Sequence, residues 1–172
     1  MNRFRLRRLI GRGGMGEVYE VEALIPGSAS KPVALKIMRG KLRLQPRYTE
    51  LFHREARTNL DISHEHPGLV TVFGHFEDSA GQLYIVMDLI RGCSLRTLLK
   101  EYERLPLDII LYIAAGMLDA LDHMHNLGYL HLDLSPSNVL ISCEGQVKIS
   151  DLGLAKYVPK EGAPSSHVGK PP

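Results

Sequence analysis

The first ninety residues alternate apolar and polar positions mostly at the spacing of β-strands. A nearly continuous apolar run over residues 32–38 contains a single lysine, and the turn sequence EDSAG joins the last two strands of this part. One helix is expected among the strands, because apolar positions in residues 49–62 fall near one helical face. The predicted strands are residues 4–10, 17–23, 32–38, 69–75 and 82–89.

Helical spacing replaces strand spacing in the second half of the chain. Ser94 is expected to cap a short helix that extends to residue 103, since a serine oxygen can accept a hydrogen bond from the first helical amides. Residues 107–126 predict a longer helix that is apolar around most of its circumference, so we expect it to be buried, with Gly128 just beyond its end. A hairpin is predicted next, formed by residues 138–142 and 146–150.

The composition favours a globular protein of the reducing compartment. The chain has 172 residues, 44% of them hydrophobic, which is enough to bury a core. Its formal net charge of +2 argues against a dedicated nucleic-acid or membrane-surface binder. Cys93 and Cys143 are too few for a disulfide framework or a cysteine zinc site. We therefore expect a cytoplasmic protein that has neither nucleic acid nor membrane as a partner.

Three further observations concern the ends of the chain and membrane insertion. The longest apolar run, residues 109–118, is too short to span a bilayer, and the basic N-terminus lacks the apolar core of a signal peptide. From Val158 onward the composition is that of a loop, with four prolines and two glycines. A compact domain rarely ends in such a loop, so we expect further sequence to belong to this domain.

A glycine cluster, GRGGMG, lies between the first two predicted strands. A glycine-rich turn lets backbone amides approach phosphate oxygens without clashes from Cβ atoms. A dinucleotide-binding turn would need a helix to begin at the third glycine of the motif, whereas here a strand follows, so dinucleotide binding is excluded. The candidate phosphate-binding glycines are Gly11, Gly13, Gly14 and Gly16.

Lys36 lies in the middle of the apolar run VALKIM. A lysine at such a position is either solvent-facing on an edge strand or buried with a partner, because an unpaired buried charge is costly. In the second case it is a candidate phosphate ligand held by a carboxylate. Glu55 of the following helix is the natural partner and Glu50 is the alternative.

A third group of residues carries oxygen ligands. Asp133 is followed five residues later by Asn138, and Asp151 comes after the predicted hairpin. Such oxygen donors suit Mg²⁺, which binds proteins through one or two carboxylates together with substrate phosphates. Each of these residues taken singly is more often a turn or cap residue than a metal ligand. The chain's histidines have no cysteine or acidic partner at zinc spacing, which argues against a zinc site.

The order of these motifs resembles the signature set of protein kinases: a glycine-rich loop, VALK, a helix glutamate, H-x-D-x-x-x-x-N and D-x-G. The sequence GRGGMGEVYEV near the N-terminus most resembles the bacterial branch of eukaryotic-like (Hanks-type) serine/threonine kinases. The resemblance implies an α+β fold with two lobes. Residues 1–90 would form the N-lobe, with a hinge at about residues 88–92, and residues 93–172 would form part of the C-lobe, ending in the activation segment.

The resemblance also implies a role for each matching residue. The glycines would cover the phosphates of ATP, and Lys36, oriented by Glu55, would hold the α- and β-phosphates. Asp133 would accept or orient the proton of the substrate hydroxyl, and Asn138 and Asp151 would hold Mg²⁺. The positions that match the adenine pocket and the hinge are Ile10, Val18, Ala34, Met87, Asp88, Ile90 and Leu140.

Four residues depart from the family pattern. Leu132 stands where the family has the arginine that collects an activation-loop phosphate, and Ser135 stands where serine/threonine kinases have a lysine. Leu152 replaces the phenylalanine of the D-F-G motif, and Asn59 lies where the family places an apolar residue. The sequence also ends before any A-P-E motif, so the later helices that form much of the protein-substrate platform are absent from it.

Two expectations concern the last residues. Because Leu132 cannot pair with a phosphate, replacing Ser165 and Ser166 by alanine is expected to leave the activity of a completed domain nearly unchanged. Lys170 lies where the family has a threonine, so its ammonium could supply the charge that Ser135 does not; a solvated loop lysine is the alternative.

The reaction expected from the resemblance is phosphoryl transfer from MgATP to serine or threonine hydroxyls of proteins, weak or absent in this chain alone. A non-catalytic ATP-binding pseudokinase or an interaction module is the alternative. A small-molecule phosphotransferase is less favoured, because the compact GRGGMGEVYE and SPSN patterns are typical of protein kinases. The protein substrate is not identified by the sequence.

Overall fold

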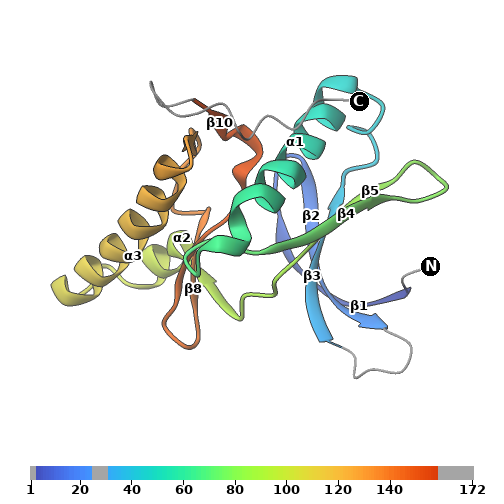
Figure 1. Ribbon diagram of the computed structural model, residues 1–172. Coiled ribbons are helices and arrows are strands. Elements are labelled where there is room, and N and C mark those ends of the chain that lie inside the picture. The colour runs from blue at the N-terminus through green and yellow to red at the C-terminus, as the bar shows by residue number, and fades with distance from the viewer. Residues whose placement is uncertain (1–2, 25–30, 159–172) are drawn as a thin grey trace.

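The N-terminal part is a five-stranded antiparallel sheet with one helix beside it (Figure 1). The computed structural model describes residues 3–24 and 31–158. The strand order is β1-β2-β3-β5-β4. The strands are β1 (Arg3–Arg12), β2 (Gly16–Leu24), β3 (Lys31–Met38), β4 (Val72–Glu77) and β5 (Leu83–Met87), and the helix is α1 (Pro46–Ile62).

One face of α1 packs on the sheet, as its apolar spacing predicts. Phe52 and Ala56 are buried against Met38 of β3, and residues of β4 and β5 complete the same cluster. The helix begins three residues earlier than predicted, because Pro46 occupies its first turn, where the missing amide of proline is not needed.

The fourth strand also differs from its prediction over residues 69–75. The strand β4 begins at Val72, and Leu69 instead forms an isolated parallel bridge with Ile149 in the C-terminal part. The backbone amide of Val70 donates to the carbonyl of Ile149, and the amide of Ile149 donates to the carbonyl of Gly68. The segment at residues 69–71 is thus a connection that ties the two halves of the molecule together.

The C-terminal part contains two helices and short strands. Ser94 caps α2 as predicted, since its Oγ accepts the amide of Thr97 at 3.2 Å. Gly128 follows α3 with a φ of +82°, which favours glycine at this helix end. Two small sheets have the orders β6-β8-β9 and β7-β10. The elements are β6 (Gly92–Ser94), α2 (Leu95–Glu101), α3 (Leu107–Asn126), β7 (Tyr129–Leu130), β8 (Val139–Ser142), β9 (Val147–Ile149) and β10 (Lys156–Tyr157).

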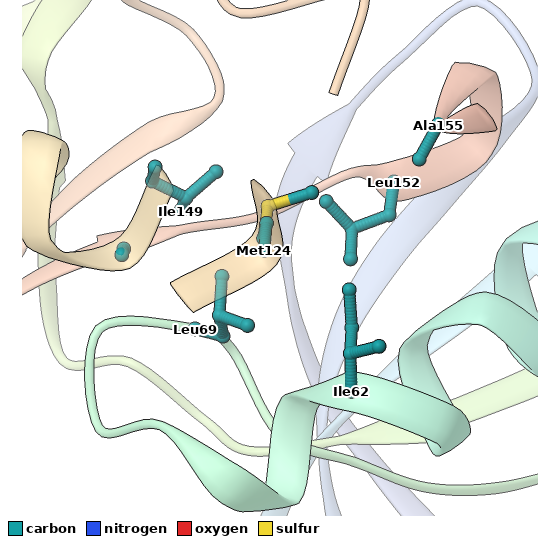
Figure 2. Packing of buried hydrophobic residues seen from close by; sticks show 7 residues of the cluster. Ile62, Leu69, Met124, Ile149, Leu152 and Ala155 are labelled. Carbon is teal, nitrogen blue, oxygen red and sulfur yellow. The ribbon is translucent and has the colours of Figure 1, made fainter. Parts of the chain in front are cut away.

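A hydrophobic cluster joins the two halves (Figure 2). Ile62, at the end of α1, packs with Leu152, and Met124 of α3 lies in the same cluster. Leu152 is 1% exposed and belongs to the short 3₁₀ turn η2 (Leu152–Leu154). Leu152, which replaces a phenylalanine of the family pattern, therefore still fills an apolar site at the C-terminal end of α1. The other members are Leu69, Ala120, Ile149 and Ala155.

The expectation that α3 is buried around most of its surface is wrong. One face of the helix is buried through Ile113, Ala120 and Met124. On its other sides Leu107 is 70% exposed and Leu118 is 65% exposed. Apolar composition predicts that a surface can be covered, but within residues 3–24 and 31–158 nothing covers these positions.

The predicted α+β class is confirmed, with a sheet-rich N-terminal part and a C-terminal part that contains more helix. The predicted division into an N-lobe of residues 1–90 and a partial C-lobe of residues 93–172 stays a prediction. Among the described helices, none combines the length and the apolar character that crossing a membrane requires.

Candidate active site

The centre of the site is a lysine bound by two carboxylates. Lys36 Nζ donates to both carboxylate oxygens of Glu55, at 2.6 Å and 2.7 Å, and to Asp151 Oδ1 at 2.7 Å. The three residues come from β3, from α1 and from the segment after β9. Of the two partners considered for Lys36, the structure pairs it with Glu55, while Glu50 is exposed on the outward side of α1.

The fold explains why Lys36 is buried with its partner. The strand β3 lies between β2 and β5, where Lys36 pairs with Val18 and Ile85, so the edge-strand interpretation does not apply. Lys36 is 8% exposed and Glu55 is 3% exposed. A buried charge is tolerated when opposite charges and hydrogen bonds compensate its lost hydration, and this pair supplies both.

The three charges affect each other's protonation. Burial alone would lower the pKa of Lys36, but the Glu55 and Asp151 carboxylates outweigh burial and raise it. Burial would raise the pKa of Asp151, and the Lys36 ammonium reverses this and lowers it. Burial raises the pKa of Glu55 to about 7, with Lys36 opposing the shift. Glu55 is therefore the member of the group that titrates near neutral pH.

The turn that presents Asp151 has a constrained backbone. Asp151 has a φ of +68°, in the left-handed region that few residues other than glycine adopt. A Cβ at Gly153 would lie 3.3 Å from Glu55 Oε2 and 3.4 Å from Met15 Cε, so little space is left for a side chain. Arg54 Nη2 donates to the carbonyl of Gly153 at 3.2 Å, which connects α1 to this turn a second time.

The segment from residue 131 to 138 is held by hydrogen bonds to its own backbone and to the end of β9. His131 is buried; its Nδ1 accepts the amide of Asp133 at 3.3 Å, and its Nε2 donates to the carbonyl of Ser150 at 3.2 Å. Asn138 Nδ2 donates to the carbonyl of Asp133 at 2.8 Å. The amide of Ser150 donates to the carbonyl of Asn138 at 2.9 Å, so Asp133, Asn138 and Asp151 belong to one connected unit.

The glycine cluster forms the turn between β1 and β2. The amide of Gly13 donates to the carbonyl of Gly16 at 2.9 Å. A Cβ at Gly16 would lie 2.7 Å from the carbonyl oxygen of Ile37, so this position requires glycine for packing. A Cβ at Gly14 would meet no atom within 4 Å. The structure thus gives Gly16 a structural reason that is independent of any ligand.

The remaining candidate residues lie on several elements. Ala34 and Met87 are cross-strand partners on β3 and β5. Asp88 donates its amide to the carbonyl of Thr71 at 2.8 Å, at the start of the connection to β6. Leu132 is 62% exposed with a φ of +60°. Ser165, Ser166 and Lys170 lie outside the described residues. Other candidates are placed on β1 (Ile10, Gly11), on β2 (Val18), on β8 (Leu140) and between β5 and β6 (Ile90).

Sequence reasoning missed two residues of this region, Arg54 and Met15. Arg54 precedes Glu55, but nothing in its sequence context indicates that it reaches the turn at Gly153, ninety-nine residues away. Met15 lies inside the glycine cluster, where the sequence gives a reason to approach phosphate only to the glycines. Both contacts depend on how α1 and the glycine turn approach the Asp151 turn, and spacing along the chain does not reveal that approach.

Comparison with known proteins identifies relatives of this chain. The family model described as "Protein kinase domain" matches residues 4–172. The chain is 36% identical over 171 residues to the serine/threonine-protein kinase PknA of Mycobacterium tuberculosis strain H37Rv, which covers 97% of this chain and 38% of the relative. It is 36% identical over 158 residues to the serine/threonine-protein kinase PknE of Mycobacterium bovis, which covers 92% of this chain and 27% of the relative. The chain thus spans well under half the length of these relatives.

Proposed function

The chain belongs to the protein kinase domain family, in its bacterial Hanks-type serine/threonine branch, and from that premise we propose that it transfers the γ-phosphoryl group of ATP to serine or threonine hydroxyls of proteins. The observation that carries the proposal is the buried lysine that contacts Glu55 and Asp151 together. This contact joins β3, which carries the proposed phosphate ligand Lys36, to α1, which carries its partner Glu55, and to the turn that carries the proposed metal ligand Asp151.

Nucleotide binding is assigned to the residues around Lys36 and the glycine turn. Lys36 would hold the α- and β-phosphates, and the turn of Gly11, Gly13, Gly14 and Gly16 would cover them. The apolar surface for adenine would come from Ile10, Val18, Ala34, Met87 and Leu140, with the hinge backbone at Asp88 to Ile90 beside it. Ala34 and Met87 support this assignment because they lie side by side on neighbouring strands.

Asn138 and Asp151 carry donors that fit a divalent cation, and we propose Mg²⁺. Asn138 Nδ2 is engaged by the carbonyl of Asp133, which directs the amide oxygen of Asn138 away from that bond. The Asp151 side chain is 45% exposed, and its Oδ1 accepts a hydrogen bond from Lys36. One amide oxygen and one carboxylate are donors that suit Mg²⁺ together with phosphate oxygens. When bound, the ion would neutralise charge on the transferred phosphoryl group.

The chain's own residues would then position the acceptor. The Asp133 side chain is exposed, so it can accept or orient the proton of an incoming hydroxyl, while His131 fixes the Asp133 amide. Positioning and electrostatics supply most of the catalysis in phosphoryl transfer. The partners in this proposal are protein substrates, and their identity is open. The cytoplasmic location predicted from cysteine usage remains a prediction.

One observation favours a second candidate, a non-catalytic ATP-binding domain. Ser135 stands where the family has a cation near the γ-phosphate, and Leu132 supplies no charge either. The two functions share nucleotide binding and differ in phosphoryl transfer, so one pair of assays separates them.

The test measures the melting temperature of the chain with saturating MgATP, and then the transfer of radiolabelled phosphate to a serine-containing peptide. We expect MgATP to raise the melting temperature through mass action, and Lys36→Met to abolish the rise. Lys41→Met is the matched control, because Lys41 is exposed in the turn after β3. Absence of a rise in a folded sample would refute nucleotide binding. A rise without transfer by a C-terminally completed domain would favour the non-catalytic alternative.

A further inference from the structure

Two histidines join the connection between α1 and β4 to the helix α3, and the proposed nucleotide site uses neither of them. His66 lies in that connection, and His123 lies in the last turn of α3. Their rings stack with centroids 4.9 Å apart and an angle of 25° between the ring planes. We refer to His66 and His123 as the histidine pair. The proposed function does not explain why two titratable rings are placed against each other here.

Both ring nitrogens of His66 are engaged in a way that requires a neutral ring. The Nδ1 atom accepts the amide of Gly68 at 3.0 Å, so the ring proton is on Nε2, which lies 3.1 Å from Asp119 Oδ2. A second proton would have to bind at Nδ1, where the amide hydrogen of Gly68 already points. Protonation of His66 therefore breaks its hydrogen bond to Gly68.

His123 is restricted to the neutral form for a different reason. Its Nε2 is buried and has no hydrogen-bond partner among the residues that the structure describes. A neutral ring can leave this nitrogen as an unused acceptor. In a protonated ring the same nitrogen carries a hydrogen and part of a positive charge, and burying such a donor without an acceptor is costly. His123 can therefore be protonated only if Nε2 reaches water.

The charges around the histidine pair compensate a proton only weakly. Asp119 attracts a protonated His66, but the Asp119 side chain is 74% exposed, so solvent screens the attraction. From β9, Lys148 donates to a carbonyl of the same connection at 2.6 Å, and its positive charge opposes a further cation. Two protonated rings would also repel each other. The titratable neighbours within the connection, His64 and Glu65, are exposed to solvent.

Gly68 links the histidine pair to the rest of the molecule. The connection approaches α3 so closely that a Cβ at Gly68 would lie 2.9 Å from the Cβ of Ala120. The carbonyl of Gly68 accepts the amide of Ile149, two residues before Asp151. A change at Gly68 is therefore one hydrogen bond away from β9 and from the segment that carries Asp151.

We propose that the histidine pair is a proton-controlled contact, which holds the connection against α3 while both rings are neutral and opens as they take up protons below about pH 6. Histidine is the side chain whose charge ordinarily changes between about pH 5 and 8. The closed contact is thus present above this range and is lost as the pH falls through it. An effect on nucleotide binding, through Ile149 and Asp151, rests on the proposed function, whereas the opening of the contact does not.

The experiment measures hydrogen exchange of the Gly68 amide by NMR in the intact, ¹⁵N-labelled chain, corrected for the intrinsic pH dependence of exchange. A Glu55→Gln background removes the carboxylate of the site that titrates near neutral pH. We expect the protection of the Gly68 amide to fall about tenfold or more from about pH 7.5 to about pH 5, because its acceptor becomes protonated.

The double variant His66→Asn/His123→Phe removes both titrating rings and keeps the contacts. The asparagine oxygen can accept the Gly68 amide in place of Nδ1, and phenylalanine keeps a ring at position 123. Protection of the Gly68 amide is expected to be independent of pH in this variant. His64→Asn is the matched control and should keep the wild-type pH dependence, because His64 is exposed in the same connection and its ring contacts Phe73.

The same pH dependence in the double variant and in the wild type, or no loss of Gly68 protection in the wild type, overturns the proposal. Should the double variant not fold, the ring Cε1–H signals of the wild type decide the question. Both rings should titrate with the same midpoint as the Gly68 amide signal, and rings that titrate while that signal stays constant would overturn the proposal. MgATP takes no part in these measurements, so their failure and a failure of the proposed function are distinguishable.

Discussion

The protonation of Glu55 is expected to control nucleotide affinity near neutral pH. Burial raises its pKa to about 7, so Glu55 is mostly ionised at pH 8 and mostly protonated at pH 6. With that pKa, the ionised fraction falls from about 0.9 to about 0.1 between the two pH values. If only the ionised carboxylate orients Lys36, the apparent Kd for MgATP rises about tenfold from pH 8 to pH 6.

The assay is calorimetric titration with MgATP at pH 6, 7 and 8 and constant ionic strength. Glu55→Gln cannot ionise, so any pH dependence it keeps comes from ATP or from other groups. Glu50→Gln is the matched control on the exposed side of the same helix and should keep the wild-type pH dependence. Identical pH dependence in the wild type and in Glu55→Gln would refute the reasoning.

The stability of the fold should respond to the same proton with the opposite sign. Because the pKa of Glu55 is raised in the folded state, its contribution to stability is fully present below its unfolded pKa, near 4.5, and is lost as the pH rises through about 7. The full difference is about 3 kcal/mol. Burial also lowers the pKa of His75, with His53 and Arg57 adding to the shift, so His75 contributes to the stability profile near this range. Subtracting the Glu55→Gln profile isolates the effect of Glu55.

Three substitutions test the packing around the site by urea unfolding. Asn59→Leu should raise the free energy of unfolding by about 1 kcal/mol, since it replaces a buried amide whose bond is to its own helix backbone; a loss would show that the amide is needed. Gly92→Ala should lower the free energy of unfolding by about 2 kcal/mol or more, because the new Cβ would lie 1.9 Å from a carbonyl oxygen of β8. Gly14→Ala is the control, since a Cβ at Gly14 meets no atom within 4 Å. Equal losses of stability in the two variants would contradict the clash at Gly92. Met124→Ala should cost about 3 kcal/mol, against less than about 1 for the exposed Leu118→Ala; similar losses would mean that both faces of α3 are covered.

Local patterns predicted the elements better than their ends. The helix over residues 49–62 and the strands beside it follow from apolar spacing, which is a property of neighbouring residues. The choice between Glu50 and Glu55 was also available in that spacing. Glu55 lies three residues after Phe52 and four before Asn59, on the buried face, and Glu50 does not share that face. The pattern that predicts the helix therefore also favours Glu55 over Glu50 as the partner of Lys36.

The exposed side of α3 could not be predicted in the same way. An apolar helix surface shows that burial would be favourable, but it does not show which segment provides the cover. In the described residues β9 and the cluster around Met124 cover one side only. Leu118 and Ile113 are both large apolar residues of α3, yet Ile113 is buried and Leu118 is exposed. The difference comes from which distant segments pack against each of them.

Lys148 makes the same point for buried charge. Like Lys36, it is a lysine within a short apolar strand, and it is 7% exposed. Its ammonium group donates to the carbonyl of Pro67 at 2.6 Å, eighty-one residues away, and the described residues offer it no carboxylate within 4.0 Å. The sequence can state that each lysine needs acceptors, because desolvation without them is too costly. Which acceptors arrive depends on the tertiary structure: α1 brings a carboxylate to Lys36, while the connection to β4 brings backbone carbonyls to Lys148. One residue pattern therefore corresponds to a proposed phosphate ligand in β3 and to a structural tie in β9.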